Sequence, residues 1–198
     1  MKSKSTVTII VLIILGFLLM KGCSGYNSMN GLKQQVGQAW SDVENQYKRR
    51  SDLIPNLIAT VKGAANFEQE TLTKVIEARA KATSIQVDAN DLSPDKLKEF
   101  QAAQDQLSGS LSRLLVVAEQ YPTLTATQNF QNLQVELSST ENKIATERSR
   151  FNEVVKNYNT AVTSLPNRLY AGLMGFKEKG YFTATEQEKE TPKVDFTK

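Results

Sequence analysis

The 198-residue chain contains no histidine and only one cysteine, Cys23. The lack of histidine excludes Glu-x-x-His metal sites and nucleophiles that depend on a histidine base. A single cysteine excludes an intrachain disulfide framework, so we expect a hydrophobic core to hold the fold. Gly172, Gly175 and Gly180 have neither the dinucleotide-binding nor the Walker spacing. We therefore predict no catalytic residue, no metal site and no cofactor.

Strong charge bias and long apolar runs are also scarce. The net charge is only +3, and the basic residues form no stripe along the chain, which argues against a nucleic-acid partner. A single long apolar run, Val7–Met20, lies close to the start of the chain. What remains is mixed-charge sequence with helical periodicity, typical of a globular helical domain.

The apolar run predicts a membrane anchor. As a helix, Val7–Met20 rises about 21 Å, which is shorter than the hydrocarbon core of a bilayer. The flanking residues from Ser5 to Cys23 can also lie in a membrane helix and extend its length to roughly 28 Å. That length is enough to cross if the Lys21 side chain reaches its ammonium group to the headgroups. We therefore expect residues 1–25 to be an uncleaved transmembrane helix in contact with the lipid bilayer. The predicted anchor positions are Val7, Ile10, Leu12, Ile14, Phe17, Leu19 and Met20.

Two cleavage alternatives stay open. Cys23 is a candidate for the lipidated first residue of a lipoprotein, and a signal peptidase could cut after Gly25. For an uncleaved anchor, the positive charges of Lys2, Lys4 and the amino terminus outweigh Lys21. The positive-inside rule then places the amino terminus in the cytoplasm and the main domain outside.

Helical periodicity predicts three long helices after the anchor. In the first, a 3–4 apolar rhythm continues to about Lys81, and Pro55 should kink the helix or restart it near Ile54. Ser93-Pro94 opens the second, with serine as the cap and proline at the first helical position. We expect the core stripe of the second and third helices to consist of Leu97, Phe100, Leu107, Leu111, Leu114, Phe130, Leu133, Leu137, Ile144, Phe151, Val155, Tyr158 and Val162.

The third helix is expected to start at a capping box formed by Thr125 and Gln128 and to stop at Pro166. A short helix near Arg168–Met174 is a further expectation. Because no strand pattern or repeat is present, long helices with short connections predict an all-α, up-and-down bundle.

Two surface features are candidates for contact with a partner. Lys48, Arg49 and Arg50 form the densest basic cluster, interpreted either as a solvated face paired with Glu44 and Asp52 or as a patch for an acidic partner. The C-terminal aromatic residues are too apolar for a free tail. They either dock on the bundle or engage another copy or a partner: Phe176, Tyr181, Phe182 and Phe196.

Three polar residues of the third helix are candidates for a functional role. Glu141, Asn142 and Arg148 form either a binding site or, as we favour, a half-buried network that sets the register of the helices.

Several blocks together resemble the LemA family of bacterial membrane proteins. The resemblance extends from about Tyr26 to Phe196, and the blocks occur in a fixed order. They are Tyr26-Asn27, AWSDVENQYKRRSDLIPNLIATVKG (39–63), ETLTKVIEAR (70–79), LSGSLSRLLVVAEQYPTL (107–124), STENKIATER (139–148), YNTAV (158–162), AGLMGFKEKGYF (171–182) and PKVDF (192–196).

The resemblance implies a four-helix bundle, here residues 26–185, on a single N-terminal anchor in the bacterial cytoplasmic membrane, followed by a polar tail, 186–198. Members resemble a magnetosome-membrane protein, and some lie near genes for a membrane zinc metalloprotease. The family often has His-Glu where this chain has Phe67-Glu68. Phenylalanine cannot transfer a proton, so no catalytic role is expected at that position.

These observations lead to one functional hypothesis with two alternatives. We expect a non-enzymatic scaffold or adaptor of the envelope with an unknown protein partner, for which a membrane protease is one candidate. The alternatives are a self-assembling structural protein, hence a homo-oligomer, and a hydrolase that uses carboxylates such as Glu68 or Glu141.

Overall fold

The computed structural model describes residues 2–63 and 67–183. These residues form four long helices, α1 (Lys2–Lys62), α2 (Gln69–Ser84), α3 (Pro94–Ala118) and α5 (Gln128–Thr163). Two short elements complete the fold, α4 (Pro122–Thr125) and the 3-10 helix η1 (Asn167–Leu169). No β-strand occurs in the described ranges, and the prediction of an all-helical chain is confirmed.

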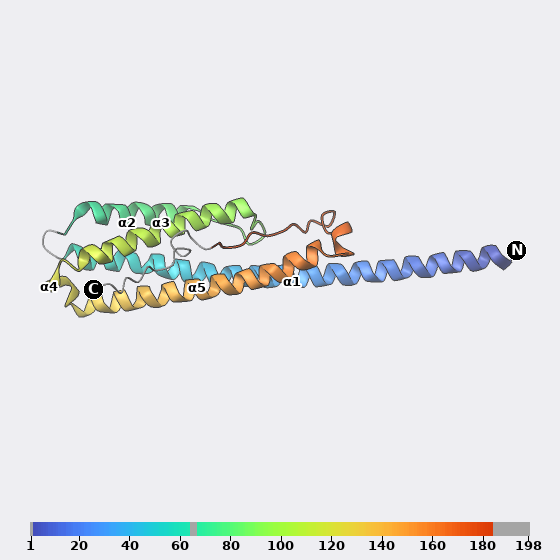
Figure 1. Ribbon diagram of the computed structural model, residues 1–198, viewed down its shortest axis with the longest axis horizontal. Coiled ribbons are helices and arrows are strands. Elements are labelled where there is room, and N and C mark those ends of the chain that lie inside the picture. The colour runs from blue at the N-terminus through green and yellow to red at the C-terminus, as the bar shows by residue number, and fades with distance from the viewer. Residues whose placement is uncertain (1, 64–66, 184–198) are drawn as a thin grey trace, which may run out of the picture.

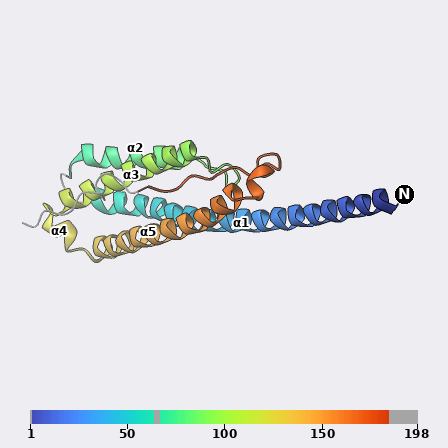
Figure 2. The ribbon, with the colours of Figure 1, turned by 45° about the vertical axis from the view of Figure 1, so that its right-hand side comes forward.

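The long helices pack as two pairs in an up-and-down arrangement. α1 lies along α5, and α2 lies along α3, with each successive long helix reversing direction (Figure 1). The N-terminal part of α1 extends far beyond the other helices in both views (Figures 1 and 2). The bundle is therefore built around the C-terminal half of α1.

Of the two effects expected at Pro55, a kink or a restart, the restart does not occur, because α1 continues through Pro55 to Lys62. Proline has no amide hydrogen, so the carbonyl of Ser51, one turn earlier, loses its usual helical donor. Arg79 of α2 replaces that donor, because its Nε donates to the Ser51 carbonyl oxygen at 2.9 Å. A contact from a neighbouring helix thus compensates for the proline.

The expected continuation of the first helix to Lys81 was wrong. α1 ends at Lys62, and α2 is a separate helix from Gln69 that packs against α3. The apolar stripe of α2, Leu72, Val75, Ala78 and Ala82, is buried against that neighbour. This reversal supplies the fourth long helix, which the periodicity alone had merged with the first.

The caps of the later helices agree only in part with the prediction. Ser93 occupies the N-cap position of α3 and Pro94 is its first residue, as predicted, although the Ser93 side chain forms no capping hydrogen bond. Thr125 does not cap the last long helix, because it is the final residue of α4. Thr127 takes that role, and its side chain accepts a hydrogen bond from the Phe130 amide at 3.4 Å.

The core has two parts, arranged along the bundle. The aromatic core, on the side of the N-terminal extension, is centred on Trp40, Phe100, Phe151 and Phe182. The aliphatic core, at the opposite end, contains Ile54, Leu57, Leu72, Leu107, Leu111, Leu114, Phe130 and Leu137. The predicted stripes of the second and third long helices are buried in these two cores, except Leu133, which is partly buried against the aliphatic core.

The predicted membrane anchor falls largely outside the described side chains. The backbone of residues 2–25 belongs to α1, and of the seven anchor positions only Leu12 is described, with 61% of its side chain exposed. Val7, Ile10, Ile14, Phe17, Leu19 and Met20 lie outside the described side chains. Within the described part of the chain, no helix is both long and apolar enough to cross a membrane.

Candidate functional site

A buried polar layer lies between the two cores. Arg50 of α1 donates from Nη1 to Glu141 Oε1 of α5 at 2.7 Å, and from Nη2 to the side-chain oxygen of Gln104 of α3 at 2.7 Å. The Gln104 side-chain nitrogen donates to the Ala82 carbonyl oxygen at 3.2 Å. Ser108 Oγ donates to the same Glu141 oxygen at 3.1 Å. The Arg50 layer, defined as Arg50, Gln104, Ser108 and Glu141, therefore contacts all four long helices.

The position of this layer follows from the heptad rhythm of the helices. Arg50 occupies an interior position of α1, since it continues the spacing of Val43, Tyr47, Ile54 and Leu57. Gln104 does the same in α3, between Phe100 and Leu107. A polar residue at an interior position restricts helix register, because a shift of one turn would leave its charge unpaired.

The ion pair is asymmetric in burial. The Arg50 side chain is 2% exposed, whereas the Glu141 side chain is 39% exposed. The guanidinium also lies 5.2 Å from the centre of the Tyr47 ring. Burial raises the pKa of Tyr47 to about 12, against the opposing effects of Arg148 and Arg50. The layer thus holds one buried cation, with the Tyr47 phenol beside it and the Glu141 carboxylate at its edge.

The structure corrects the interpretation of the basic cluster. Lys48 and Arg49 are exposed, and Arg49 forms an exposed ion pair with Glu136 at 2.5 Å. Arg50 is 1% exposed, so it belongs neither to a solvated face nor to a patch that a partner can reach. The expected pairing with Glu44 or Asp52 is replaced by interhelical partners, because helix phase turns Arg50 about 100° away from Arg49.

The segment after η1 folds back onto the bundle and is held by three side-chain amides. Asn159 pairs with Lys179, donating to its carbonyl oxygen and accepting from its amide, both at 2.9 Å. Asn152 forms the same two-bond pair with the backbone of Phe182 at 2.8 and 2.9 Å. Gln101 pairs likewise with the backbone of Thr183 at 2.6 and 3.1 Å. None of these three amides was predicted from the sequence, where their only signal is that they interrupt or border apolar stripes.

The aromatic side chains of this segment are part of the core. Phe182 stacks on Trp40 with ring centres 6.2 Å apart and meets the edge of Phe151 at 5.3 Å. Phe176 packs against Tyr26 at 5.5 Å. Phe176 and Phe182 are each 5% exposed, whereas Tyr181 is 44% exposed. Of the three candidate contacts in the tail, only Tyr181 is presented to a partner here. Phe196 and the polar tail, 186–198, lie outside the described residues.

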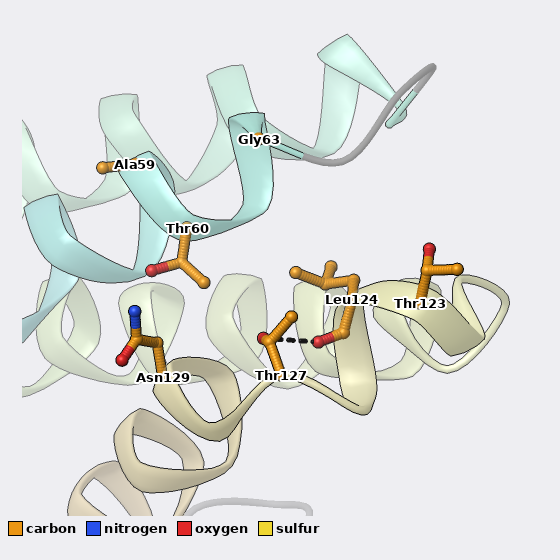
Figure 3. Close-up of a pocket in the computed structure, with 7 residues that line it drawn as sticks. All are labelled: Ala59, Thr60, Gly63, Thr123, Leu124, Thr127 and Asn129. Atoms are coloured by element: carbon orange, nitrogen blue, oxygen red, sulfur yellow. Dashed lines mark hydrogen bonds between the residues drawn. The ribbon is translucent and has the colours of Figure 1, made fainter.

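The described surface contains two hollows of about 450 Å³ each. One lies at the end of α1, and Figure 3 shows its lining of small and uncharged side chains, with Thr127 Oγ1 donating to the Leu124 carbonyl oxygen at 2.7 Å. The other lies around Arg49 and Glu136 and includes Lys48. The first hollow has no titratable group to move a proton, and the second exposes an ion pair suited to polar contact.

The two carboxylates considered as candidates for catalysis, Glu68 and Glu141, are held as hydrogen-bond partners of other side chains. Residues 2–63 and 67–183 contain no group of three or more metal-ligating side chains. Glu68 accepts a hydrogen bond from the Thr71 hydroxyl at 3.0 Å near the start of α2, while Glu141 is engaged by Arg50. The exposed carboxyl groups of Asp88 and Asp91 have lowered pKa values, caused first by hydrogen bonds from Asn90 and Lys96, respectively.

Comparison with known proteins gives a consistent relationship over most of the chain. Protein LemA of Metamycoplasma hominis is 29% identical over 166 residues, which cover 82% of this chain and 69% of that protein. Magnetosome protein MamQ 2 of Paramagnetospirillum magneticum is 26% identical over 193 residues, or 87% of this chain and 68% of the relative. Magnetosome protein MamQ of Magnetospirillum gryphiswaldense is 26% identical over 178 residues, which cover 79% of this chain and 64% of that protein. The model of the LemA family matches residues 39–196, and the chain therefore belongs to the LemA family.

Proposed function

We propose that this protein is a non-enzymatic, membrane-anchored scaffold or adaptor of the bacterial envelope. The observation that carries the proposal is the continuity of α1, a single helix from Lys2 to Lys62 that contains both the apolar run and a core stripe of the bundle. A helix without interruption transmits position and tilt directly, so an anchor at one end would hold the bundle at a fixed distance from the bilayer.

Membrane association and orientation are parts of the same proposal. Its support is membership of the LemA family, the similarity to magnetosome proteins and the length of the apolar run. The charges of Lys2 and Lys4 favour a cytoplasmic amino terminus in the cytoplasmic membrane and a bundle on the outer side. A lipoprotein attached through Cys23 is the alternative, and Cys23 lies exposed within α1.

Intact-mass measurement of the mature protein distinguishes these two attachments. A mass that begins at Met1 or Lys2 supports the transmembrane helix. A mass that begins at a diacylated or triacylated Cys23 supports the lipoprotein and contradicts the proposed anchor.

The non-enzymatic part of the proposal is supported by how the interior polar groups are used. Arg50, Gln104 and Glu141 bond to one another across helices, and the amides of Asn152 and Asn159 bond to the tail backbone. A hydrolase would instead need an acid and a base directed towards one cavity. Stoichiometric zinc or iron in the purified, tag-free full-length protein would contradict this assignment.

The adaptor is expected to meet its partner through the exposed part of the basic cluster and through Tyr181. A photo-crosslinker at Lys48 in native membranes, with mass spectrometry of the product, should capture one dominant protein, and an envelope protease is one candidate. The same crosslinker at Val116, 62% exposed on α3, provides the control. Equal capture from both positions would argue against a specific surface.

Self-assembly is the alternative within the binding class. The size of the detergent-solubilised full-length protein separates the two: a monomer supports the adaptor, and a discrete oligomer supports a structural assembly.

A further inference from the structure

The turn that follows α5 exposes an unusual concentration of large apolar side chains. Within residues 165–174, here called the apolar loop, Leu165 and Leu169 are each 74% exposed, Leu173 is 91% exposed and Met174 is 47% exposed. Other large exposed apolar residues on the helices of the bundle, such as Val135, occur singly, which is ordinary for a protein surface. Four such side chains within ten residues are the kind of exposed apolar concentration that marks an interaction surface.

Packing fixes the apolar loop to α1. Gly25 of α1 approaches the loop so closely that a Cβ atom there would collide with the Tyr170 hydroxyl and with Asn167 Oδ1. Those two loop residues are joined by a hydrogen bond of 2.6 Å from the Tyr170 hydroxyl to Asn167. The Tyr26–Phe176 ring contact holds the segment that follows the loop to the same helix. In Figures 1 and 2 the orange-red loop lies at the end of the bundle nearest the N-terminal extension of α1.

The position of Gly25 determines the height of the loop relative to the apolar run. Gly25 lies two positions after Cys23, the end of the predicted span, which corresponds to about 3 Å along the helix. If the span from Ser5 to Cys23 crosses the hydrocarbon core, as the proposed function requires, this distance places Gly25 at the level of the lipid headgroups, a layer roughly 5–8 Å thick on each side. The leucines of the loop are therefore delivered to the surface of the bilayer.

We infer that the apolar loop is a second membrane contact, whose leucine side chains insert into the interfacial region of the leaflet next to the anchor. Leucines beside a basic residue are the pattern of interfacial membrane-binding elements, and the exposed Arg168 lies between Leu165 and Leu169. A single helix leaves the bundle free to tilt. Contact at the helix and at the loop fixes its tilt and its rotation, and so determines which face a partner can reach.

The bilayer is a better occupant for the loop than a second copy of the chain. The loop is tied to the part of α1 that leads directly into the apolar run, so any arrangement that embeds the run brings the loop to lipid first. Insertion also leaves the Arg168 guanidinium at the headgroups, where anionic phosphates attract it, whereas a symmetric contact between two loops would bring two arginines together.

Fluorescence quenching in the full-length protein tests this inference. In a Cys23→Ser background, an environment-sensitive probe is attached to Leu173→Cys, and the protein is reconstituted into vesicles that contain anionic lipid and a mixture of shallow and deep spin-labelled lipids. Leu173 is 91% exposed, so the substitution does not disturb the core. Leu12→Cys reports on the anchor, and Val135→Cys, on the exposed face of α5, is the matched control in water.

Spin-labelled lipid should reduce the probe signal at residues 12 and 173 by at least about twofold and leave residue 135 unchanged, as interfacial insertion requires. Quenching at residue 12 without quenching at 173 would overturn the loop contact while leaving the anchor in place. No quenching at residue 12 would contradict the proposed anchor, and the loop contact with it. A third outcome is a blue shift of the probe emission at residue 173 without quenching by spin-labelled lipid. If dilution of the protein with more lipid reverses that blue shift, the loop contacts a second copy of the chain instead of the bilayer.

Discussion

Replacement of Arg50 tests whether the polar layer holds the four helices together. Arg50→Ala removes three hydrogen bonds, one to Glu141 and two to Gln104. Breaking a fully buried ion pair costs about 3–5 kcal/mol. Here water can solvate the remaining carboxylate, because Glu141 is 39% exposed, but the buried Gln104 oxygen loses its donor at a cost of about 1–3 kcal/mol. We expect a loss of about 2–4 kcal/mol in the free energy of unfolding.

Arg49→Ala is the matched control, since it removes the same residue type one position earlier. In the Arg49–Glu136 ion pair, the Arg49 side chain is 53% exposed and the Glu136 side chain is 42% exposed. Loss of this pair should therefore lower the free energy of unfolding by less than about 1 kcal/mol. Arg50→Lys should fall between the two variants, because an ammonium group cannot reproduce the fork of the guanidinium.

Urea unfolding of the full-length protein in non-ionic micelles provides the measurement. Trp40 is the single tryptophan and is 1% exposed in the aromatic core, so its fluorescence reports on the bundle. Urea is preferred to guanidinium chloride because it does not screen ion pairs. If Arg50→Ala and Arg49→Ala differ by less than about 0.5 kcal/mol, the polar layer does not stabilise the fold as reasoned here.

Three further predictions use the same unfolding assays. Leu111→Ala and Phe151→Ala should each cost about 2–5 kcal/mol, since both side chains are buried, and losses as small as that of Arg49→Ala would refute the core assignment. The raised pKa of Tyr47 means that the folded protein keeps the phenol proton after the unfolded chain loses it. The free energy of unfolding should therefore fall by about 2–3 kcal/mol between pH 10 and 12. In thermal unfolding, the Tyr47→Phe variant should not show this pH-dependent loss of stability. Gly180→Ala should destabilise by about 1–3 kcal/mol because its Cβ would lie 2.9 Å from a Cα atom of α3. Gly172→Ala has no atom within 4 Å of its Cβ and should be near neutral, so equal effects from both glycines would contradict the close contact.

The sequence by itself determined the features that depend on nearby residues. Apolar spacing identified the stripes of α3 and α5, and Ser93-Pro94 located the start of α3, because capping and amphipathicity act within one or two turns. The lack of histidine and of a disulfide framework also limits the chemistry of the chain before any fold is known.

The tertiary structure alone decided what depends on neighbouring helices. Pro55 stays inside α1 because Arg79 of another helix supplies the missing donor, and no local rule predicts that contact. Adjacent arginines are alike in composition, yet only Arg50 faces Gln104 and Glu141. The same dependence applies to the tail, whose docking rests on amides of α3 and α5 that are far away in sequence. Local sequence fixes which residues prefer a helix, whereas the burial and pairing of each side chain depend on the surfaces that the other helices bring to it.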